Sequence, residues 1–351
     1  MDRERVKSFA DRVFADMAGT MTAGMGYVGV KTGLFRAMAG KGAMRIEDVV
    51  RESGLTARYV EEWLKGMTCA KYLDYDAASE TYRLADEHAF LLASDETDHF
   101  MGGLFVWAPV LLRVAPDVAT AFARGGGVPF EKFGADGVAG LDLMNRGQYE
   151  QRLAGYWLQA LPEARAGLEA GGRALDVGCG AGRVAVTLAK AFPKATVLGL
   201  DPDRESIRQA EAGAAEAGLS GRLSFVASTT GELDAGEGFD LITACDCVHD
   251  FAAPQPTLKE IRALLKPEGT LFIIEPRAAD KLEDNINPIA TMLYGFSIFH
   301  CMTQSLAQGG PGLGTCMGPA RTEKLLREAG FREFRQLEIK SPTNLFYAAR
   351  A

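Results

Sequence analysis

The fold is decided by the stretch Leu175-Asp176-Val177-Gly178-Cys179-Gly180-Ala181-Gly182. The apolar run at residues 173–177 predicts a buried strand, and residues 183–191 predict a helix. Three glycines at alternate positions fall on the turn between them. Because glycine has no Cβ, the backbone can turn sharply there and approach a ligand closely. The pattern therefore predicts a nucleotide-binding turn.

The spacing of the glycines argues against a dinucleotide. The dinucleotide fingerprint is G-x-G-x-x-G, with the pyrophosphate at the helix N-terminus. Here the third glycine comes one residue early, and Arg183 stands where it would be needed. Asp176 adds a carboxylate at the strand tip, which repels a pyrophosphate but favours a cation. S-adenosylmethionine presents such a cation through its amino group and its sulfonium.

A second carboxylate supports the same cofactor. Asp201 closes the next apolar run, residues 196–200, and can accept hydrogen bonds from both ribose hydroxyls. The alternative is an ordinary tight turn followed by a solvated carboxylate. The glycine loop, Asp176 and Asp201 together favour the cofactor site.

Composition narrows the class of protein. A chain of 351 residues has the length of about two domains. Its net charge of −8 argues against a non-specific nucleic-acid binder, because phosphate contacts need a basic surface. The charged N-terminus lacks the apolar core of a signal peptide, and the apolar stretch at residues 101–112 is too short to span a bilayer. We expect a cytoplasmic protein with neither nucleic acid nor membrane as partner.

The six cysteines show neither C-x-x-C pairing nor zinc spacing, so no metal site is predicted, and reduced thiols fit the cytoplasm. Five of them are expected near one rim of the fold, which raises a thiol- or metalloid-related role. Buried cysteine that acts as a small apolar residue is the commoner case. The five are Cys179, Cys245, Cys247, Cys301 and Cys316.

Residues 1–93 predict a winged-helix domain. Helices at 46–52 and 57–67 precede two short strands at 72–75 and 81–84. The second helix balances Arg58 and Lys65 against two glutamates, whereas a helix that reads DNA should be basic. We therefore favour a dimerisation and scaffold module over a DNA reader. Residues 18–39 predict a buried helix or helix pair for the same interface.

The rest of the chain divides in two. Residues 94–171 predict a helical connector and pocket wall, with a helix at 141–161. Residues 172–351 alternate strands and helices, which implies a parallel sheet covered on both faces. Pro267-Glu268-Gly269 is expected to stop the helix before the fifth strand. The predicted strands are residues 174–177, 196–200, 223–227, 241–244, 270–274, 335–339 and 345–349.

Residues 173–351 resemble a class I S-adenosylmethionine-dependent methyltransferase, and the whole chain resembles the winged-helix small-molecule O-methyltransferases of bacteria and plants. The resemblance implies a doubly wound α/β fold with a seven-stranded sheet whose last strand is antiparallel. It implies a homodimer, a small-molecule substrate, and a glycine loop that packs on the methionine part of the cofactor. It also implies cofactor contacts from Asp176, Gly178, Gly180, Gly182, Asp201, Pro202, Ser228, Thr229, Cys245 and Asp246.

Cys247-Val248-His249-Asp250-Phe251 is similar to the His-Asp-aromatic motif of these O-methyltransferases, whose histidine is the general base. Histidine can take a proton near neutral pH, and a nearby carboxylate, Asp250 or Glu275, would orient its ring. The alternative for His249 is an N-cap or an ordinary loop histidine.

The chain departs from the family pattern in two places. The run Ala227-Ser228-Thr229-Thr230 lacks the usual acidic residue after the third strand, so Ser228 is the candidate adenine contact. The motif aromatic is Phe251 where the family usually has Trp.

Residues 286–318 form a long apolar, glycine-rich insertion that we interpret as a lid over the rim. Within it, His300 is either a second catalytic group that faces the substrate or a packed lid histidine.

Three functional hypotheses follow. The first is methyl transfer from S-adenosylmethionine to a small molecule, with His249 as base and oxygen as acceptor. The second is a regulator that binds DNA through the winged-helix domain and uses the cofactor as a signal. The third is an enzyme of the same fold with other chemistry, since fold alone does not decide function.

Overall fold

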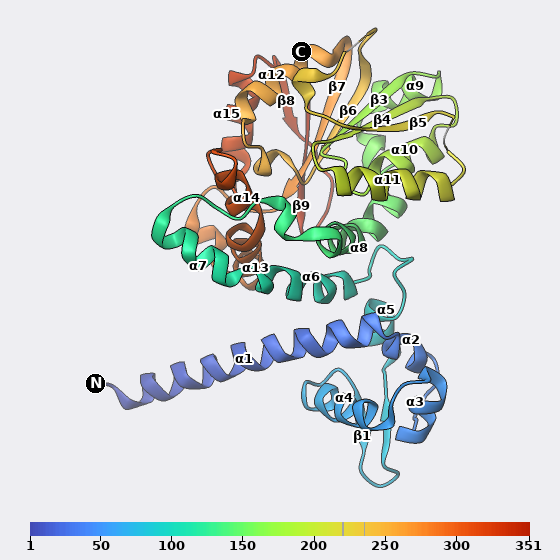
Figure 1. Ribbon diagram of the computed structural model, residues 1–351, viewed down its shortest axis with the longest axis vertical. Helices are drawn as coiled ribbons and strands as arrows, with labels where there is room; N and C mark the ends of the chain where they lie inside the picture. The colour runs from blue at the N-terminus through green and yellow to red at the C-terminus, as the bar shows by residue number, and fades with distance from the viewer. Residues whose placement is uncertain (220, 235) are drawn as a thin grey trace. The chain divides into compact units, whose positions relative to one another are not determined.

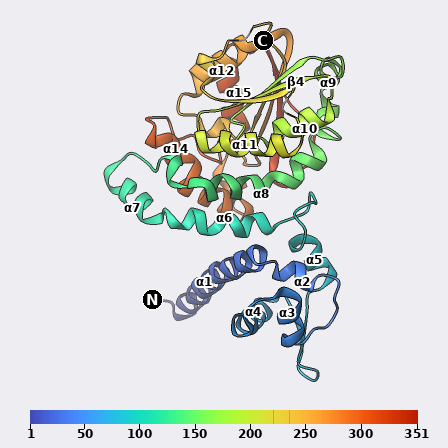
Figure 2. The same cartoon turned by 45° about the vertical axis from the view of Figure 1, so that its right-hand side comes forward.

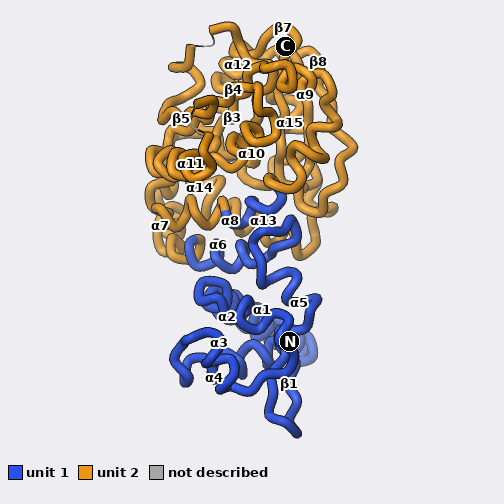
Figure 3. Tube along the Cα trace, turned by 90° about the vertical axis from the view of Figure 1, so that its right-hand side faces the viewer, with its two compact units in different colours: residues 1–110, 143–148 blue, residues 111–142, 149–351 orange. Residues whose placement is uncertain are grey.

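The computed structural model describes residues 1–219, 221–234 and 236–351, and the chain divides into two compact units (Figure 3). The first unit comprises Met1–Val110 and Leu143–Gln148, and the second comprises Leu111–Asp142 and Tyr149–Ala351. The three-part division expected from the sequence stays a prediction.

The first unit contains the predicted helices and the predicted hairpin. Its core encloses the apolar stripe of α4, where Trp63 meets Phe35 edge-on and donates its indole N–H to the Met25 carbonyl. The predicted winged-helix arrangement is confirmed. The elements are α1 (Arg3–Lys31), α2 (Leu34–Met38), α3 (Ile46–Ser53), α4 (Ala57–Cys69), β1 (Asp74–Asp76), β2 (Thr81–Arg83) and α5 (Asp86–Leu92).

The helix pair expected within residues 18–39 is present as α1 and α2, but α1 is largely exposed in this chain. Only Gly26 and Gly29 of α1 are buried, at the points where aromatic rings approach its backbone. Further toward the N-terminus, α1 is exposed along its length. The expected burial is therefore found for α2, whose Leu34, Phe35 and Met38 are buried, but not for most of α1 within one copy of the chain.

The chain passes from one unit to the other within α6 (Gly102–Arg113) and again within α8 (Gly134–Arg152). Along the chain, α7 (Ala115–Arg124) and the 3₁₀ turn η1 (Phe130–Lys132) lie between these two helices. The helix predicted at 141–161 is wrong in its extent. Its α-helical part ends at Arg152, and the 3₁₀ turn η2 (Trp157–Ala160) precedes α9 (Pro162–Glu169).

The second unit is built on a seven-stranded sheet of order β5-β4-β3-β6-β7-β9-β8 (Figure 1). Strand β9 runs antiparallel to both of its neighbours, while β3 to β7 pair in parallel. The predicted doubly wound α/β sheet is confirmed. Its strands are β3 (Arg173–Val177), β4 (Thr196–Asp201), β5 (Leu223–Ala227), β6 (Phe239–Cys245), β7 (Leu265–Pro276), β8 (Glu333–Gln336) and β9 (Asn344–Arg350).

Helices cover both faces of this sheet. One apolar core lies under α9, α10 (Arg183–Ala191) and α11 (Arg204–Glu216), and α10 and α11 lie side by side (Figures 1 and 2). The other core lies under α12 (Pro254–Leu264) and α15 (Pro319–Glu328). The insertion after β7 is helical: η5 (Leu282–Asn285), α13 (Pro288–Phe296), the π-helix η6 (Ser297–Cys301) and α14 (Met302–Ala307).

The role expected for Pro267-Glu268-Gly269 is wrong. The helix before the fifth strand ends at Leu264, and strand β7 begins at Leu265, so these residues lie within the strand. They form an irregularity in the ladder, because Phe239 pairs with Leu265 and Leu241 pairs with Thr270. Leu265 takes an extended backbone conformation with ψ 143° and ends the helix on its own.

Within the described ranges, no single helix is both long and apolar enough to cross a membrane. Only α6 and α7 taken together pass a test of length and composition, as a pair bent by 49°.

Replacement of Phe346 tests the core on the α9 side of the sheet. Its ring is fully buried and lies 5.0 Å from the Trp157 ring, centroid to centroid. We expect Phe346→Ala to lower the free energy of unfolding by about 3–5 kcal/mol in urea denaturation. Phe122→Ala removes an exposed ring from α7 and should change it by less than about 0.5 kcal/mol. Equal changes in the free energy of unfolding for the two substitutions would contradict the placement of Phe346 in this core.

Candidate active site

The glycine loop between β3 and α10 has the backbone that its sequence predicts. Gly178, Gly180 and Gly182 have φ values of 65°, 51° and 77°, which side chains rarely allow. A Cβ at Gly178 would lie 2.9 Å from the Cβ of Cys247, and one at Gly182 would clash with Phe225. A Cβ at Gly180 would meet no atom within 4 Å. Packing thus requires two of the glycines, while Gly180 borders open space that a ligand can fill.

Asp176 is buried beside this loop. One of its carboxylate oxygens accepts a hydrogen bond from the Thr243 hydroxyl at 2.7 Å. Burial raises the pKa of Asp176 to about 7, against the hydrogen bonds from Thr243 and the Ala185 backbone that lower it. Within the described residues, no cationic side chain contributes to the pKa shift of Asp176. A bound cation would therefore stabilise the carboxylate, which fits the amino group and sulfonium of S-adenosylmethionine.

Asp201 lies at the end of β4 and is tied to the same loop. Its Oδ2 accepts the Gly180 N–H at 3.0 Å, and its Oδ1 accepts the Asp203 N–H at 2.9 Å. Burial raises the pKa of Asp201 to about 6, although both hydrogen bonds oppose the rise. The exposed Pro202 follows it. Asp201 therefore fixes the glycine loop, and its contact with a ribose stays a prediction.

A carboxylate that the sequence analysis missed, that of Glu232, lies in the turn after β5. The Ser228 hydroxyl donates to Oε2 of Glu232 at 2.8 Å, and the Thr229 N–H donates to the same oxygen at 3.4 Å. These hydrogen bonds, that from Ser228 first, lower the pKa of Glu232. Glu232 belongs to the 3₁₀ turn η3 (Thr230–Glu232), whose Thr229 and Glu232 form a capping box. That pairing is a signal the sequence contained.

Asp246 follows β6, which ends at Cys245, and takes a left-handed backbone conformation with φ 52°. Its Oδ2 accepts the Tyr149 hydroxyl at 2.7 Å, and its Oδ1 accepts the Asn344 amide at 3.0 Å. Burial raises the pKa of Asp246 to about 6. Tyr149 on α8 and Asn344 on β9 were not predicted as its partners, because both are far from Asp246 in the sequence.

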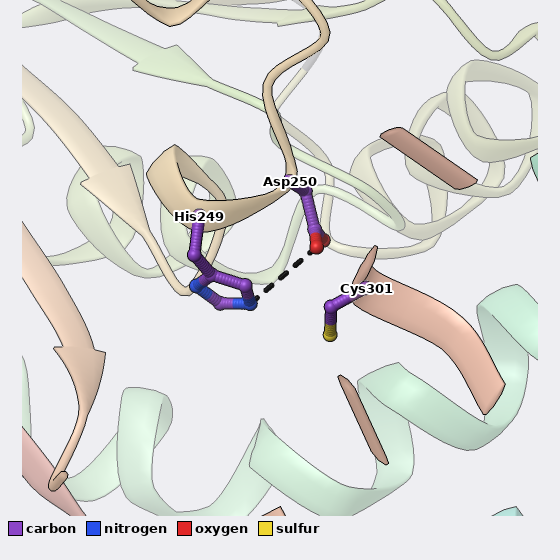
Figure 4. Close-up of side chains that lie close together, drawn as sticks. All are labelled: His249, Asp250 and Cys301. Carbon is purple, nitrogen blue, oxygen red and sulfur yellow. Dashed lines mark ion pairs between the residues drawn. The ribbon is translucent and has the colours of Figure 1, made fainter. Parts of the chain in front are cut away.

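His249 lies in the 3₁₀ turn η4 (Val248–Asp250), two residues past Cys247. Its Nδ1 is 2.5 Å from Oε2 of Glu275 on β7, and both side chains are buried. The other oxygen of Glu275 accepts the Val248 N–H at 3.1 Å. The Nε2 atom of His249 lies 3.5 Å from Oδ1 of Asp250 (Figure 4). Glu275 therefore fixes the ring from behind and leaves Nε2 for another partner.

Two carboxylates decide the protonation of His249. Burial alone would lower its pKa, but the charges of Glu275 and Asp250 outweigh this and hold the pKa of His249 well above its ordinary value. A proton taken up by this ring is thus strongly stabilised.

The turn that carries His249 contacts both the glycine loop and the insertion after β7. The Cys247 thiol donates to the Val177 carbonyl at the end of β3, at 3.2 Å, and the Cys247 side chain lies against Gly178 of the loop. From the insertion, the Gly314 N–H donates to the His249 carbonyl and the Ser305 hydroxyl donates to the Phe251 carbonyl. The structure therefore brings His249, Asp250 and Glu275 next to the predicted cofactor loop. The function of residues 286–318 as a lid stays a prediction.

His300 lies in the π-helix η6 among aromatic rings. Its ring centroid is 4.7 Å from that of Phe133 and 5.7 Å from that of Phe130. Burial lowers the pKa of His300 to about 4, so the ring is neutral near neutral pH. Its Nδ1 is 3.6 Å from the Cys301 sulfur. The contacts with aromatic rings favour the alternative in which His300 is a packed lid histidine. A catalytic role for His300 stays a prediction.

Comparison with known protein families identifies two domains. Residues 168–330 match a family described as a methyltransferase domain. Residues 20–94 match a family described as an Rv2258c-like winged HTH domain. Both matches agree with the resemblance drawn from the sequence.

Individual relatives are more distant. Over 101 residues, or 29% of this chain, the sequence is 33% identical to a ubiquinone biosynthesis O-methyltransferase of Bradyrhizobium diazoefficiens. The match spans 38% of that relative, which is less than half of its length.

Solved structures resemble the chain over nearly its whole length. A candidate O-methyltransferase from Nostoc punctiforme has a TM-score of 0.74 at 19% identity, covering 97% of this chain and 98% of its own. Human N-acetylserotonin methyltransferase, in complex with S-adenosylmethionine, has a TM-score of 0.65 at 21% identity and 97% coverage of both chains. At these identities the likeness shows the fold.

The charge state of Asp176 predicts a pH dependence of cofactor binding. Below a pH of about 7 the carboxyl is largely protonated, and above it the carboxylate can attract a cation. The dissociation constant for S-adenosylmethionine, measured by calorimetry, should therefore fall as pH rises through about 7 and then level off. Asp201, with a pKa of about 6, adds a smaller step at lower pH. Asp176→Asn should bind weakly at every pH, and a flat wild-type profile would contradict the role of Asp176.

Proposed function

We propose that this chain, which carries a methyltransferase domain in residues 168–330 behind a winged-helix domain, transfers a methyl group from S-adenosylmethionine to a hydroxyl oxygen of a small molecule. The observation that carries the proposal is the buried His249–Glu275 pair beside the glycine loop. It combines a site for the donor with a base for the acceptor.

The residues at the carboxyl ends of the strands fit the donor part by part. The Asp176 carboxylate would face its cationic end, and the backbone at Gly180 would approach its methionine part. Asp201 would hold the ribose, and Ser228 together with Glu232 would contact the adenine amino group. When bound, S-adenosylmethionine supplies an electrophilic methyl carbon on its sulfonium.

His249 would take the proton of the acceptor hydroxyl at Nε2. Glu275 holds Nδ1, so the ring keeps one orientation and its charged form is stabilised. General-base help of this kind contributes about 10²–10⁴-fold in rate. Alignment of the oxygen with the methyl carbon and the sulfur contributes about 7–11 kcal/mol more, through positioning. Asp250 would assist from the Nε2 side of the ring.

We propose that the winged-helix domain serves as a scaffold and does not read DNA. On α4, the Arg58 guanidinium lies 2.5 Å from Oε2 of Glu62. On the same helix, Nζ of Lys65 lies 2.5 Å from Oε1 of Glu61. The cations of this helix are thus neutralised by its own glutamates, which favours a scaffold over a DNA reader.

We further propose that the chain is a homodimer in the cytoplasm. Helix α1 exposes a row of large apolar side chains that a second copy would cover. The six cysteines are free thiols, as expected in a reducing compartment. The exposed side chains of α1 include Phe9, Val13, Phe14, Met17 and Met21.

Substitution of His249 separates binding from chemistry. We expect His249→Ala to bind S-adenosylmethionine as the wild type does, because the ring lies outside the glycine loop. Its rate of methyl transfer should fall by about 10²–10⁴-fold. Transfer is measured by mass spectrometry, as the gain of one CH₂ by members of a panel of hydroxyl, amine, thiol and carbon-acid acceptors.

His99→Ala provides the matched control, since His99 lies in the first unit and is exposed. It should keep full activity. An unchanged rate of methyl transfer in His249→Ala would contradict the role of His249 as general base. A panel in which no acceptor gains CH₂, while the donor is bound and consumed, would favour other chemistry on the same fold.

The apolar face of α1 predicts the assembly state. Wild-type protein should be a dimer in sedimentation equilibrium, and Phe14→Asp should shift it toward the monomer, because a charge would be buried in the interface. Arg12→Asp changes charge on the same helix without removing an apolar side chain, and it should leave the dimer intact. A wild-type monomer at all concentrations would contradict the proposal.

A further inference from the structure

We propose that His249, Asp250 and Cys301 form a binding site for one zinc ion, and that zinc bound there stops methyl transfer. One ligand atom from each residue lies within 4.8 Å of the other two. Figure 4 shows the His249 ring turned toward Asp250, with Cys301 on a neighbouring segment. The inhibitory half of the proposal rests on the function proposed above, whereas the binding half does not.

The three side chains offer the chemistry that zinc prefers. Imidazole nitrogen, thiolate sulfur and carboxylate oxygen are its usual protein ligands. A thiolate and an imidazole also exclude magnesium and calcium, which favour oxygen ligands alone. Three protein ligands leave a fourth tetrahedral position open for water or another small ligand. All three residues belong to the second unit, so the cluster lies within one compact unit.

The groups around the cluster support a metal at Nε2 of His249. Nδ1 of this ring is already held by Glu275. A carboxylate behind the ring is the usual partner of a metal-binding histidine, because it fixes the ring and makes the free nitrogen more basic. Within the described residues, Oδ1 of Asp250 is buried without a hydrogen-bond partner and lies 3.5 Å from that nitrogen. A metal between the two atoms would satisfy both.

Cys301 reaches the cluster through an unusual element. It is the last residue of the π-helix η6, and single π-turns are frequently found at functional sites. The thiol is buried and lies near His300 on the same turn. Because Cys301 is far from Asp250 in the sequence, no zinc spacing appears there, and the fold alone brings the ligands together.

The required movement is small. Zinc bonds of about 2.0–2.3 Å place tetrahedral ligands about 3.3–3.7 Å apart. Atoms within 4.8 Å of one another therefore need to close by roughly one ångström. A change in the side-chain torsion of Cys301 or Asp250 supplies a movement of this size.

Metal binding and base catalysis exclude each other at this site. The Nε2 lone pair that would take the acceptor proton is the same pair that would bind zinc. Zinc at Nε2 therefore leaves the acceptor hydroxyl without its base.

Calorimetric titration of the chelator-treated full-length protein with zinc chloride tests the binding half. We expect one zinc per chain in the wild type. Cys301→Ser and Asp250→Asn should each weaken binding by more than about tenfold, since even outer-shell partners of a metal are worth about 10–100-fold in affinity. Cys69→Ser removes an exposed thiol and is the matched control, which should bind as the wild type does.

Cobalt(II) gives a second readout that does not depend on activity. A thiolate-to-cobalt charge-transfer band should appear in the wild type and in Cys316→Ser, and it should be absent in Cys301→Ser. Circular dichroism verifies that each variant is folded. If Cys301→Ser does not fold, Asp250→Asn still tests the site. No zinc uptake by the wild type, or wild-type affinity in both ligand variants, would overturn the site.

The inhibitory half is tested with an acceptor identified by the panel. One equivalent of zinc should abolish most of the transfer, a chelator should restore it, and Cys301→Ser should be less sensitive to zinc than the wild type. Unchanged transfer at saturating zinc would overturn the inhibition. If no acceptor is found, the methyl-transfer proposal fails while the zinc titration still decides the site.

Discussion

The burial of the Asp176 carboxylate at the end of β3 is the constraint on which the rest of the site depends. A buried carboxylate is costly unless a partner offsets its charge, and the hydrogen bond from Thr243 is neutral. The neighbouring Asp201 adds charge of the same sign and raises the pKa of Asp176 further. Such a site disfavours phosphate and would stabilise a cation, which is the basis for the proposed donor.

The same sheet edge carries the proposed base. Parallel strands end on one side of the sheet, so Asp176 on β3, Asp201 on β4 and Glu275 on β7 reach the same edge from distant parts of the sequence. His249 is attached to this edge by the short turn after β6 and is fixed there by Glu275. The order of the strands thus brings together a carboxylate that can stabilise a cation and the proposed proton acceptor.

The sequence predicts the features that depend on local pattern. The glycine loop, the α10 helix and the β5 strand have the predicted bounds, because each is encoded by a continuous run of residues. The sequence does not predict features that depend on contacts between residues far apart in the chain. Tyr149 and Asn344 meet Asp246 only in the folded chain, and Pro267 lies inside β7, at an irregularity in its pairing with β6. The cluster of His249, Asp250 and Cys301 is of the same kind.

The most direct test of the central claim is a pair of calorimetric titrations of the wild-type chain at a pH above the pKa of Asp176. One uses S-adenosylmethionine and the other uses nicotinamide adenine dinucleotide. The charge argument predicts saturable uptake of the sulfonium compound at one per chain, and none of the dinucleotide. Tight uptake of the dinucleotide, with no heat from the sulfonium compound, would contradict it.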